Sequence, residues 1–401
     1  MTPLTDECRA LLPDGTPVER RVAEAGLSVA AILERALERR PLGRDDVVAL
    51  LAAEREDLRA LIATADHVRA EDVGDTVTYV VNRNVNFTNV CFVNCQFCAF
   101  KRQRWEADAY THDVDALLAK VADAVERGAT EICMQGGINP QMSAFAYRDM
   151  LTAIRAAFPR IHVHAFSPME ILYGARRTRL SFADYLTMLR EAGLGSIPGT
   201  AAEILDDDVR ELLSHKKVDV ATWVEIVTTA HRLGIPSTAT IMYGHVETPQ
   251  HVAAHLDLIR RIQLETGGFT EFVPLHFIHY RTALYQRGLV APRENGPSDL
   301  RFYALCRLFF RGAIDHIQTS WVKLGHELAA LTLATGCDDF GGTLMEESIS
   351  REAGADAGEF TPPSEIERLI RSMGRRPRQR TTLYGDVVEP RAGAAGAPAG
   401  A

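Results

Sequence analysis

Three of the seven cysteines in this sequence, Cys91, Cys95 and Cys98, lie within eight residues of one another. Spacings of four and three residues let one short loop direct three thiolates at a single small group. Thiolates are soft ligands that bind zinc or iron–sulfur clusters. A structural zinc ion and an electron-transfer [4Fe–4S] cluster both take four protein ligands. A group of three therefore predicts a metal centre with one position open to a molecule other than protein.

The residues alone leave two other interpretations of the triad open. The three thiols could be buried together by chance, or they could bind zinc with a distant His or with Cys133. An odd number of cysteines, in a chain long enough to bury a core without disulfides, indicates a reducing compartment. Three cysteines lie outside both the triad and the N-terminal segment, and these are predicted to be packing residues. They are Cys133, Cys306 and Cys337.

The triad directly follows residues 78–87, which have the composition of a strand and begin a repeating strand–loop–helix pattern. Strands that alternate with helices predict βαβ units and a parallel sheet. Further strands are predicted at residues 131–135, 161–166, 194–197, 237–243, 271–277 and 314–319. Seven or eight such units predict an α/β fold, a TIM-type (β/α) barrel with eight strands. The loops that follow barrel strands form the active-site face, so the triad lies where chemistry is expected.

Helical periodicity surrounds this barrel pattern. Val29, Ile32, Leu33 and Ala36 recur on one helix face well before the first strand. We therefore divide the chain into residues 1–77 as an N-terminal helical extension, 78–345 as the barrel, 346–390 as a C-terminal extension and 391–401 as a disordered tail.

Composition excludes several classes of protein. The 401 residues include 44 Lys and Arg against 53 Asp and Glu, a formal net charge of −9. An acidic chain argues against a nucleic-acid partner. No apolar run approaches the roughly 18 residues of a membrane span, and the first residues lack a secretory pattern. We expect a cytoplasmic protein with no membrane partner. No P-loop, no G-x-S-x-G elbow and no dinucleotide-binding G-x-G-x-x-G after the first strand is present.

Two of the predicted strands carry polar residues at alternate positions. Because a strand has a two-residue period, one set faces the barrel lumen and the aliphatic set faces the surrounding helices. The residues expected to face inward are Asn82, Asn84 and Asn86 in the first strand and His162, His164 and Phe166 in the third. A polar lumen predicts a barrel that holds a ligand.

Candidate binding residues also stand at other strand ends. Residues 198–203 have two interpretations of equal weight, a helix start with Thr200 and Glu203 as a capping box, or a ligand contact. His276 and His279 are candidates for hydrogen bonds to a substrate, and without H-E-x-x-H they are a weak zinc signal.

The triad, with Phe97 before its last cysteine, resembles the signature of the radical S-adenosylmethionine (SAM) superfamily. A closer resemblance covers nearly the whole chain. The motifs that carry it are NFTNVC at 86–91, CAF at 98–100, MQGGINP at 134–140 and HAFSPME at 164–170. They resemble a branch that includes the deazaflavin chromophore synthases and two menaquinone enzymes of the futalosine route. IPGTAAEIL at 197–205 and FGGTLMEE at 340–347 most resemble the tyrosine-using half of FO synthase.

This resemblance implies a transferase that uses SAM and a [4Fe–4S] cluster bound by Cys91, Cys95 and Cys98. The open iron would chelate SAM, whose cleavage gives a 5′-deoxyadenosyl radical. That radical would break the Cα–Cβ bond of L-tyrosine, and the 4-hydroxybenzyl group would add to 5-amino-6-(D-ribitylamino)uracil on the route to FO, a precursor of coenzyme F(420). A separate ring-closing radical SAM enzyme and an electron donor are implied as partners.

The resemblance and the positions at strand ends together give candidate binding residues. Those expected at SAM are Gln135, Gly136, Gly137, His164, Phe166, Ser167, Glu170, Gly199 and Glu203. Those expected at the substrates are Asn84, Asn86, His276 and His279. Two alternatives stay open, a radical SAM enzyme of the futalosine menaquinone pathway and a non-catalytic iron–sulfur or zinc protein.

Overall fold

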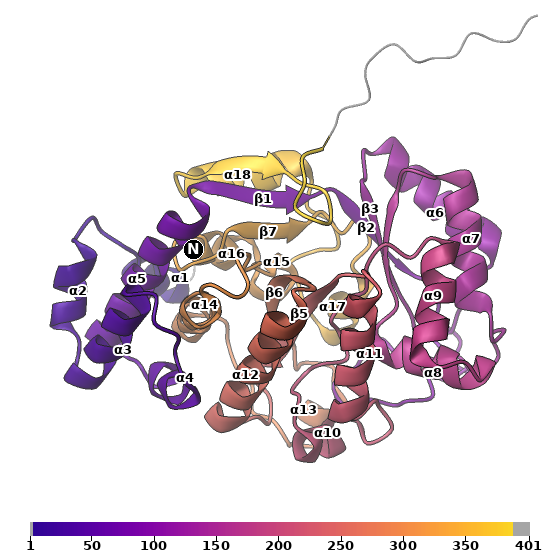
Figure 1. The fold of residues 1–401 in the computed structure, drawn as a ribbon, viewed down its shortest axis with the longest axis horizontal. Coiled ribbons are helices and arrows are strands. Elements are labelled where there is room, and N and C mark those ends of the chain that lie inside the picture. Colours follow the sequence, from indigo (N-terminus) through magenta and orange to yellow (C-terminus); the bar gives the residue numbers. More distant parts are fainter. Residues whose placement is uncertain (1–2, 388–401) are drawn as a thin grey trace, which may run out of the picture.

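The computed structural model describes residues 3–387, in which helices surround a ring of parallel strands (Figure 1). The strands are β1 Thr76–Val80, β2 Asn82–Asn86, β3 Glu131–Gln135, β4 His162–Ala165, β5 Ser237–Tyr243, β6 Phe269–His276, β7 Asp339–Gly342 and β8 Arg376–Gln379. The helices of the first half are α1 Pro3–Arg9, α2 Val18–Glu24, α3 Leu27–Leu37, α4 Arg44–Leu51, α5 Arg55–Val73, α6 Val114–Glu126, α7 Ala146–Ala157, α8 Pro168–Thr178 and α9 Phe182–Ala192. Those of the second half are α10 Asp207–Ser214, α11 Val220–Arg232, α12 Pro249–Thr266, α13 Ala283–Gln286, α14 Pro297–Phe310, α15 Trp321–Leu324, α16 His326–Thr332, α17 Ser348–Ala353 and α18 Pro363–Ser372.

Eight strand positions follow one another around the ring. β1 and β2 are successive parts of one strand, of which β1 pairs with β7 and β2 with β3, and β3 pairs with β4. The pair β5 and β6 forms the opposite side. Isolated parallel bridges fill the two remaining positions, at Ser196 and Ile197 between β4 and β5, and at Ile317 and Gln318 between β6 and β7. This arrangement confirms the predicted TIM-type barrel.

The eighth position is β7, which the sequence analysis did not predict. Its four residues, Asp-Phe-Gly-Gly, are all buried. A Cβ on Gly342 would lie 2.2 Å from the Asn82 side chain, so glycine is required where this strand meets β2. The Asn84 N–H then donates to the Leu344 carbonyl oxygen at 2.7 Å, which joins β2 to the segment after β7 and closes the ring.

Local signals explain why the helices form where the sequence places them. In α6, the Asp113 side chain accepts the Ala116 N–H and caps the first turn. Leu117, Val121 and Ala124 then recur on its buried face. Each such helix covers the outside of the ring and leaves the carboxyl ends of the strands open for loops.

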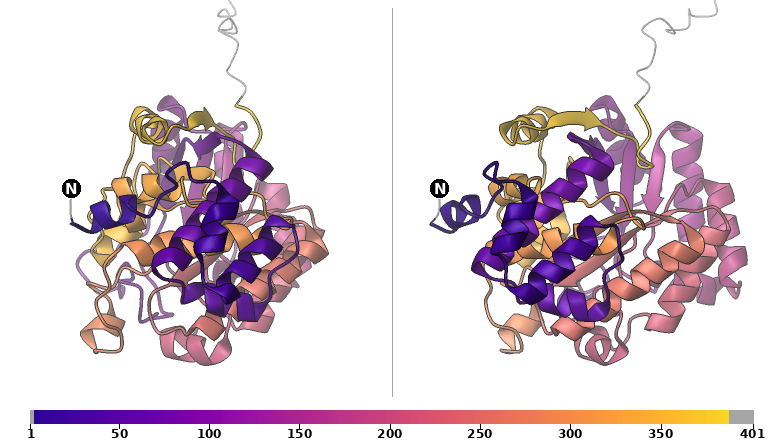
Figure 2. Two further views of the ribbon diagram at one scale, coloured as in Figure 1. Left: turned by 90° about the vertical axis from the view of Figure 1, so that its left-hand side faces the viewer. Right: turned by 60° about the vertical axis from the view of Figure 1, so that its left-hand side comes forward.

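The N-terminal helices α1 to α5 form a group at one side of the barrel, as the two turned views show (Figure 2). Two helices of this group contact later parts of the chain, since α5 packs on α14 and α4 packs on α12. At the other end of the chain β8 pairs in parallel with β1, beside α18 (Figure 1). The proposed domain boundaries at residues 77, 345 and 390 stay a prediction, and the tail at 391–401 lies outside the described residues.

Candidate active site

The three cysteines of the triad line one large cavity inside the barrel. Its volume is about 440 Å³, and it extends from the loop after β2 to the opposite end of the ring. The cavity is also lined by Gln135, Gly136, Gly137, His164, Ser167, Glu170, Glu203, Asn84 and His276, all predicted from the sequence as binding residues. The structure therefore brings most of the predicted site together around one hollow lumen.

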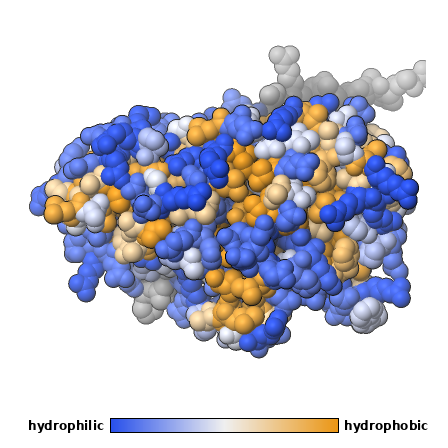
Figure 3. All heavy atoms as spheres, turned by 60° about the horizontal axis from the view of Figure 1, so that its bottom comes forward, coloured by the Kyte–Doolittle hydropathy of each residue, from blue (hydrophilic) through white to orange (hydrophobic). Residues whose placement is uncertain are grey.

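Backbone hydrogen bonds hold the triad loop between two short helices. The Gln96 N–H donates to the Leu213 carbonyl oxygen of α10 at 2.8 Å. The Leu284 N–H of α13 donates to the Gln96 carbonyl oxygen at 3.1 Å. The face with α10 and α13 comes forward in Figure 3, where hydrophobic residues gather along the middle between hydrophilic margins. The loop is thus fixed at the carboxyl ends of the strands, as the predicted barrel requires.

The triad thiols are all unpaired, and Cys95 is buried. Burial raises the pKa of the Cys95 thiol to about 11, although the nearby Lys217 ammonium opposes this shift. The Ser214 hydroxyl lies 3.0 Å from Cys95 Sγ. Lys217 also lies over the Phe97 ring, with Nζ 5.0 Å from its centroid, so a cation is built into the surroundings of the thiols. Sequence reasoning missed Lys217, because the thiol and the ring that it lies beside, Cys95 and Phe97, are more than 100 residues away in the sequence.

No group of three or more His, Cys, Asp or Glu side chains within residues 3–387 is arranged to hold a single metal ion. A tetrahedral zinc ion requires its ligands at about 2.0–2.3 Å from one point. A four-iron cluster spreads its thiolates further apart, because each cysteine binds a different iron. Three thiols that line one cavity without forming such a group are compatible with ligands of separate irons.

The two glycines after β3 bring the end of this strand against the triad loop. The Gly137 N–H donates to the Thr88 carbonyl oxygen at 2.8 Å, and the Gly136 N–H donates to Glu170 Oε1 at 3.1 Å. A Cβ on Gly137 would lie 2.2 Å from the Val90 carbonyl oxygen. Since both N–H groups are engaged, a ligand at this turn meets carbonyl oxygens, which accept hydrogen bonds.

Glu170 joins the glycine turn to the start of α8. Its Oε2 accepts the N–H and the hydroxyl of Ser167, each at 2.7 Å, which completes a capping box on α8. Burial raises the pKa of the Glu170 carboxyl to about 7, and these hydrogen bonds oppose the shift. Glu170 therefore positions the backbone that lines the cavity as well as lining it.

The Phe166 side chain does not line the cavity, so the expectation that it faces the lumen is wrong, and its assignment to SAM stays a prediction. The strand ends at Ala165, and Phe166 has a φ of 65°, which turns its side chain out of the alternating pattern. Its ring is fully buried and stacks on Tyr147 at 4.6 Å between centroids. It contributes to the core behind the site.

The segment after the fourth strand position also departs from prediction. No helix starts at Thr200, because the next helix is α10 and its cap is Asp206. The capping box predicted there is wrong. Gly199 packs on β5, where a Cβ would lie 1.9 Å from the Thr238 carbonyl oxygen, and it does not line the cavity. Glu203 does line it, but forms an ion pair with Lys217.

The structure also places four further side chains that the sequence analysis singled out. Asn86 is buried outside the cavity, where its amide donates to the Gln135 carbonyl oxygen. His162, at the amino end of β4, does not line the cavity, but it bonds Ser196 Oγ at 2.7 Å, the same hydroxyl that bonds His164 Nδ1 at 2.6 Å, so both rings lie on one side of the strand. His279 lines a second, smaller cavity instead of the main one. Cys133, predicted to be a packing residue, lines the main cavity because its position in β3 faces inward. Cys306 and Cys337 are fully buried as predicted.

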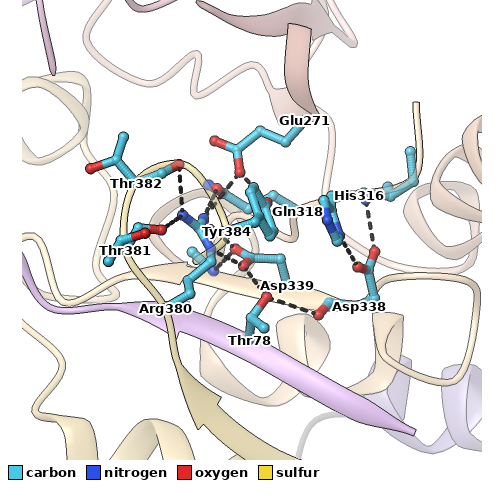
Figure 4. Close-up of polar contacts among 12 residues, drawn as sticks. Thr78, Glu271, His316, Gln318, Asp338, Asp339, Arg380, Thr381, Thr382 and Tyr384 are labelled. Carbon is cyan, nitrogen blue, oxygen red and sulfur yellow. Dashed lines mark hydrogen bonds and ion pairs between the residues drawn. The ribbon is translucent and has the colours of Figure 1, made fainter. Parts of the chain in front are cut away.

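Arg380, which follows β8, lines the lumen, and its polar contacts are drawn in Figure 4. Its guanidinium donates to the Asp339 carboxylate and to Glu271 Oε2, with Nη2 at 3.0 Å from each. The Tyr384 hydroxyl donates to Glu271, and its ring stacks on His316 at 3.6 Å. Burial raises the pKa of the Glu271 carboxyl to about 7. We call Arg380, Glu271, Asp339 and Tyr384 the floor cluster.

Comparisons with known proteins place the chain in a family. A model of the radical SAM superfamily matches residues 85–259, and a model of the CofH/MqnC C-terminal region matches residues 266–392. The 5-amino-6-(D-ribitylamino)uracil–L-tyrosine 4-hydroxyphenyl transferase of Methanothermobacter thermautotrophicus is 48% identical over 89% of this chain and 97% of its own length. The chain belongs to this radical SAM transferase family. The resemblance inferred from the motifs is confirmed.

Other relatives of the transferase family are longer proteins. FO synthase of Nocardia farcinica is 49% identical over 88% of this chain, which spans 41% of that protein. FO synthase of Streptomyces coelicolor is likewise 49% identical, and this chain spans 42% of that protein. Among solved structures, methylornithine synthase has the same fold at a TM-score of 0.68, with 17% identity over 86% of this chain and 97% of that one. None of the helices within residues 3–387 has the length and apolar character that a membrane crossing requires.

Proposed function

We propose that this chain transfers the 4-hydroxybenzyl group of L-tyrosine to 5-amino-6-(D-ribitylamino)uracil as a radical SAM transferase. The observation that carries the proposal is the 48% identity to the Methanothermobacter transferase, which extends over 97% of that enzyme. The triad in the wall of one large lumen supports it, because a cavity of this size can enclose a small-molecule ligand beside a metal centre. The FO synthases contain a further region that this chain does not match, so a separate protein would close the deazaflavin ring.

We assign a [4Fe–4S] cluster to Cys91, Cys95 and Cys98. The residues fit this group, since three free thiols on one loop line the same cavity, and a fourth position stays open for SAM. When bound, the cluster supplies the electron that cleaves SAM, and an external donor must reduce it. The chain's own part is to hold the thiols in one loop and to keep bulk water from the lumen.

SAM would lie between the triad and the carboxyl ends of β3 and β4. The turn at Gly136 and Gly137 offers carbonyl oxygens to its ammonium group. Ser167, Glu170 and His164 line the adjoining wall. Burial lowers the pKa of His164 to about 4, so its imidazole is neutral and acts as a hydrogen-bonding group there.

The deeper lumen suits the aminouracil. Asn84 and Glu131 line it, and Glu131 Oε1 accepts from Asn82 Nδ2 at 2.8 Å. Glu271 of the floor cluster lines the same space. These carboxylates are acceptors for the many N–H and O–H donors of a ribitylaminouracil.

Replacing Gly137 by Ala is expected to lower kcat/KM for SAM cleavage by about 100-fold, the cost of a displacement of about 1 Å at a reacting centre. The new Cβ would meet the Val90 carbonyl oxygen and displace the start of the triad loop. Formation of 5′-deoxyadenosine measures the effect. Gly43→Ala is the matched control, because its Cβ would have only an ordinary contact at 3.8 Å, outside both cavities. Cleavage by Gly137→Ala at the wild-type rate would contradict the assignment.

The function itself is tested with anaerobically reconstituted, reduced protein and SAM. We expect an uncyclised 4-hydroxybenzyl–uracil adduct only when tyrosine and the aminouracil are both present. Consumption of a menaquinone-route substrate, with the tyrosine pair inert, would show that the branch is wrong. The finished fluorescent chromophore from this chain alone would exclude the separate ring-closing partner. A cluster whose paramagnetic spectrum does not respond to SAM would favour a non-catalytic iron–sulfur protein.

A further inference from the structure

A second cavity of about 220 Å³ adjoins the main lumen. The two cavities share five lining residues, which are His276, Phe277, Ile278, Val322 and Lys323. We call the smaller one the side cavity. Lys323 lies in the wall between them, on the short helix α15 that follows the seventh strand position. The side cavity and the lumen therefore share a wall, and Lys323 is part of the lining of both.

Two cations, Lys323 and Arg293, line the side cavity, and the Glu347 carboxylate acts on Lys323 from nearby. Lys323 Nζ donates to Ser350 Oγ at 2.8 Å, and Arg293 Nη2 donates to Ser298 Oγ at 2.9 Å. Within residues 3–387 neither cation forms an ion pair. Asp356 is the acid in the lining, and it is exposed at the rim. An anionic ligand in this cavity would form charge-assisted hydrogen bonds with the two half-buried cations.

His279 also indicates a missing partner in the side cavity. Its side chain is 3% exposed, and its Nε2 has no hydrogen-bond partner within the described residues. The ring is fixed between Tyr280 and Tyr285, at 4.1 and 4.8 Å between centroids. Buried polar atoms in proteins are almost always hydrogen-bonded. An unpartnered nitrogen on a rigid ring, in the lining of a cationic cavity, points to a ligand with acceptor oxygens.

We propose that the side cavity binds the α-carboxylate of the amino-acid substrate, with Lys323 and His279 as its partners. This inference rests on the proposed function, in which the substrates are L-tyrosine and an aminouracil. Tyrosine carries the anionic group of this pair, whereas the aminouracil is neutral and rich in donors. With its carboxylate at Lys323, tyrosine keeps its Cα and Cβ atoms in the main lumen, on the side of the triad.

Equilibrium binding to the cluster-loaded protein with SAM, before reduction, tests this inference without turnover. The probes are L-tyrosine, tyramine (the same molecule without the carboxylate) and the aminouracil. Lys323→Met is expected to weaken tyrosine binding by about 10-fold or more, as loss of a charged hydrogen bond does. Tyramine and aminouracil binding should not change. His279→Ala should also weaken the binding of tyrosine selectively. Lys323→Arg should keep part of the preference for tyrosine over tyramine.

Lys120→Met is the matched control, since Lys120 lies on α6, pairs with Glu346 and lines neither cavity. It should bind all three probes like the wild type. An unchanged ratio of tyrosine to tyramine affinity in both Lys323→Met and His279→Ala would overturn the inference. A Lys323→Met variant that no longer binds the aminouracil but still binds tyrosine would also overturn it. A wild-type protein that binds no tyrosine would instead refute the proposed function, and this inference with it.

Discussion

Replacing Cys95 by Ala is expected to abolish cleavage of SAM while the barrel stays folded. Loss of a residue that only supports a metal ligand typically costs about 10–100-fold, so loss of a ligand should cost more than about 100-fold. The side chain is small and sits in a loop after β2, not in the ring. Iron content, the SAM-dependent paramagnetic spectrum and 5′-deoxyadenosine formation measure the loss, and far-ultraviolet circular dichroism measures the fold. The same result is expected for Cys91→Ala and Cys98→Ala.

Cys8 and Cys306 provide matched controls for this experiment. Both are buried cysteines outside the two cavities, in α1 and α14. Their Ala variants remove a thiol of the same kind and should cleave SAM at the wild-type rate. If Cys95→Ala also retained cleavage, the triad would not be the cluster site.

Replacing Arg380 by Met is expected to lower the free energy of unfolding by about 3–5 kcal/mol. This variant leaves the carboxylates of Asp339 and Glu271 buried without their cation, and breaking a buried pair in this way costs that much. Such a loss is a large part of the roughly 5–15 kcal/mol that stabilises a typical domain. Chemical denaturation monitored by circular dichroism measures it.

Arg378→Met is the control, because Arg378 lies two residues earlier on β8 and is exposed. Its ion pair with Asp386 has a distance of 3.4 Å, and such surface pairs contribute about 0–1 kcal/mol. Equal stability of the two variants would show that the floor cluster does not depend on Arg380. Arg380→Lys should fall between them, since lysine keeps the charge without the planar fork.

The sequence predicts the barrel and the triad well because both depend on short-range patterns. Alternation identifies Asn84 and His164 as lumen residues, and both line the cavity. The same rule fails at Phe166, where a positive φ interrupts the strand that alternation assumes. Such a backbone conformation at a bulky residue has no signal in the sequence.

The floor of the lumen is not predictable in this way. β8 consists of Arg-Pro-Arg-Gln, a polar run whose proline is typical of a loop or an edge strand. Its pairing with β1 is set by contacts between distant parts of the chain, and Arg380 enters the lumen only as a result of it. Lys217 and Lys323 were missed for the same reason, because their contacts with the site come from distant parts of the chain and neither belongs to a motif.

The pairing of Thr76 with Arg376 joins residues three hundred positions apart, and this determines when the enzyme can take shape during synthesis. Until residues 376–384 leave the ribosome, β1 has an unpaired edge and the lumen lacks the floor cluster. Open strand edges promote association between chains, so the nascent protein passes through an aggregation-prone stage. Contacts of such long range also slow folding. Expression at low temperature, with chaperones that protect the open barrel, should therefore increase the yield of folded enzyme.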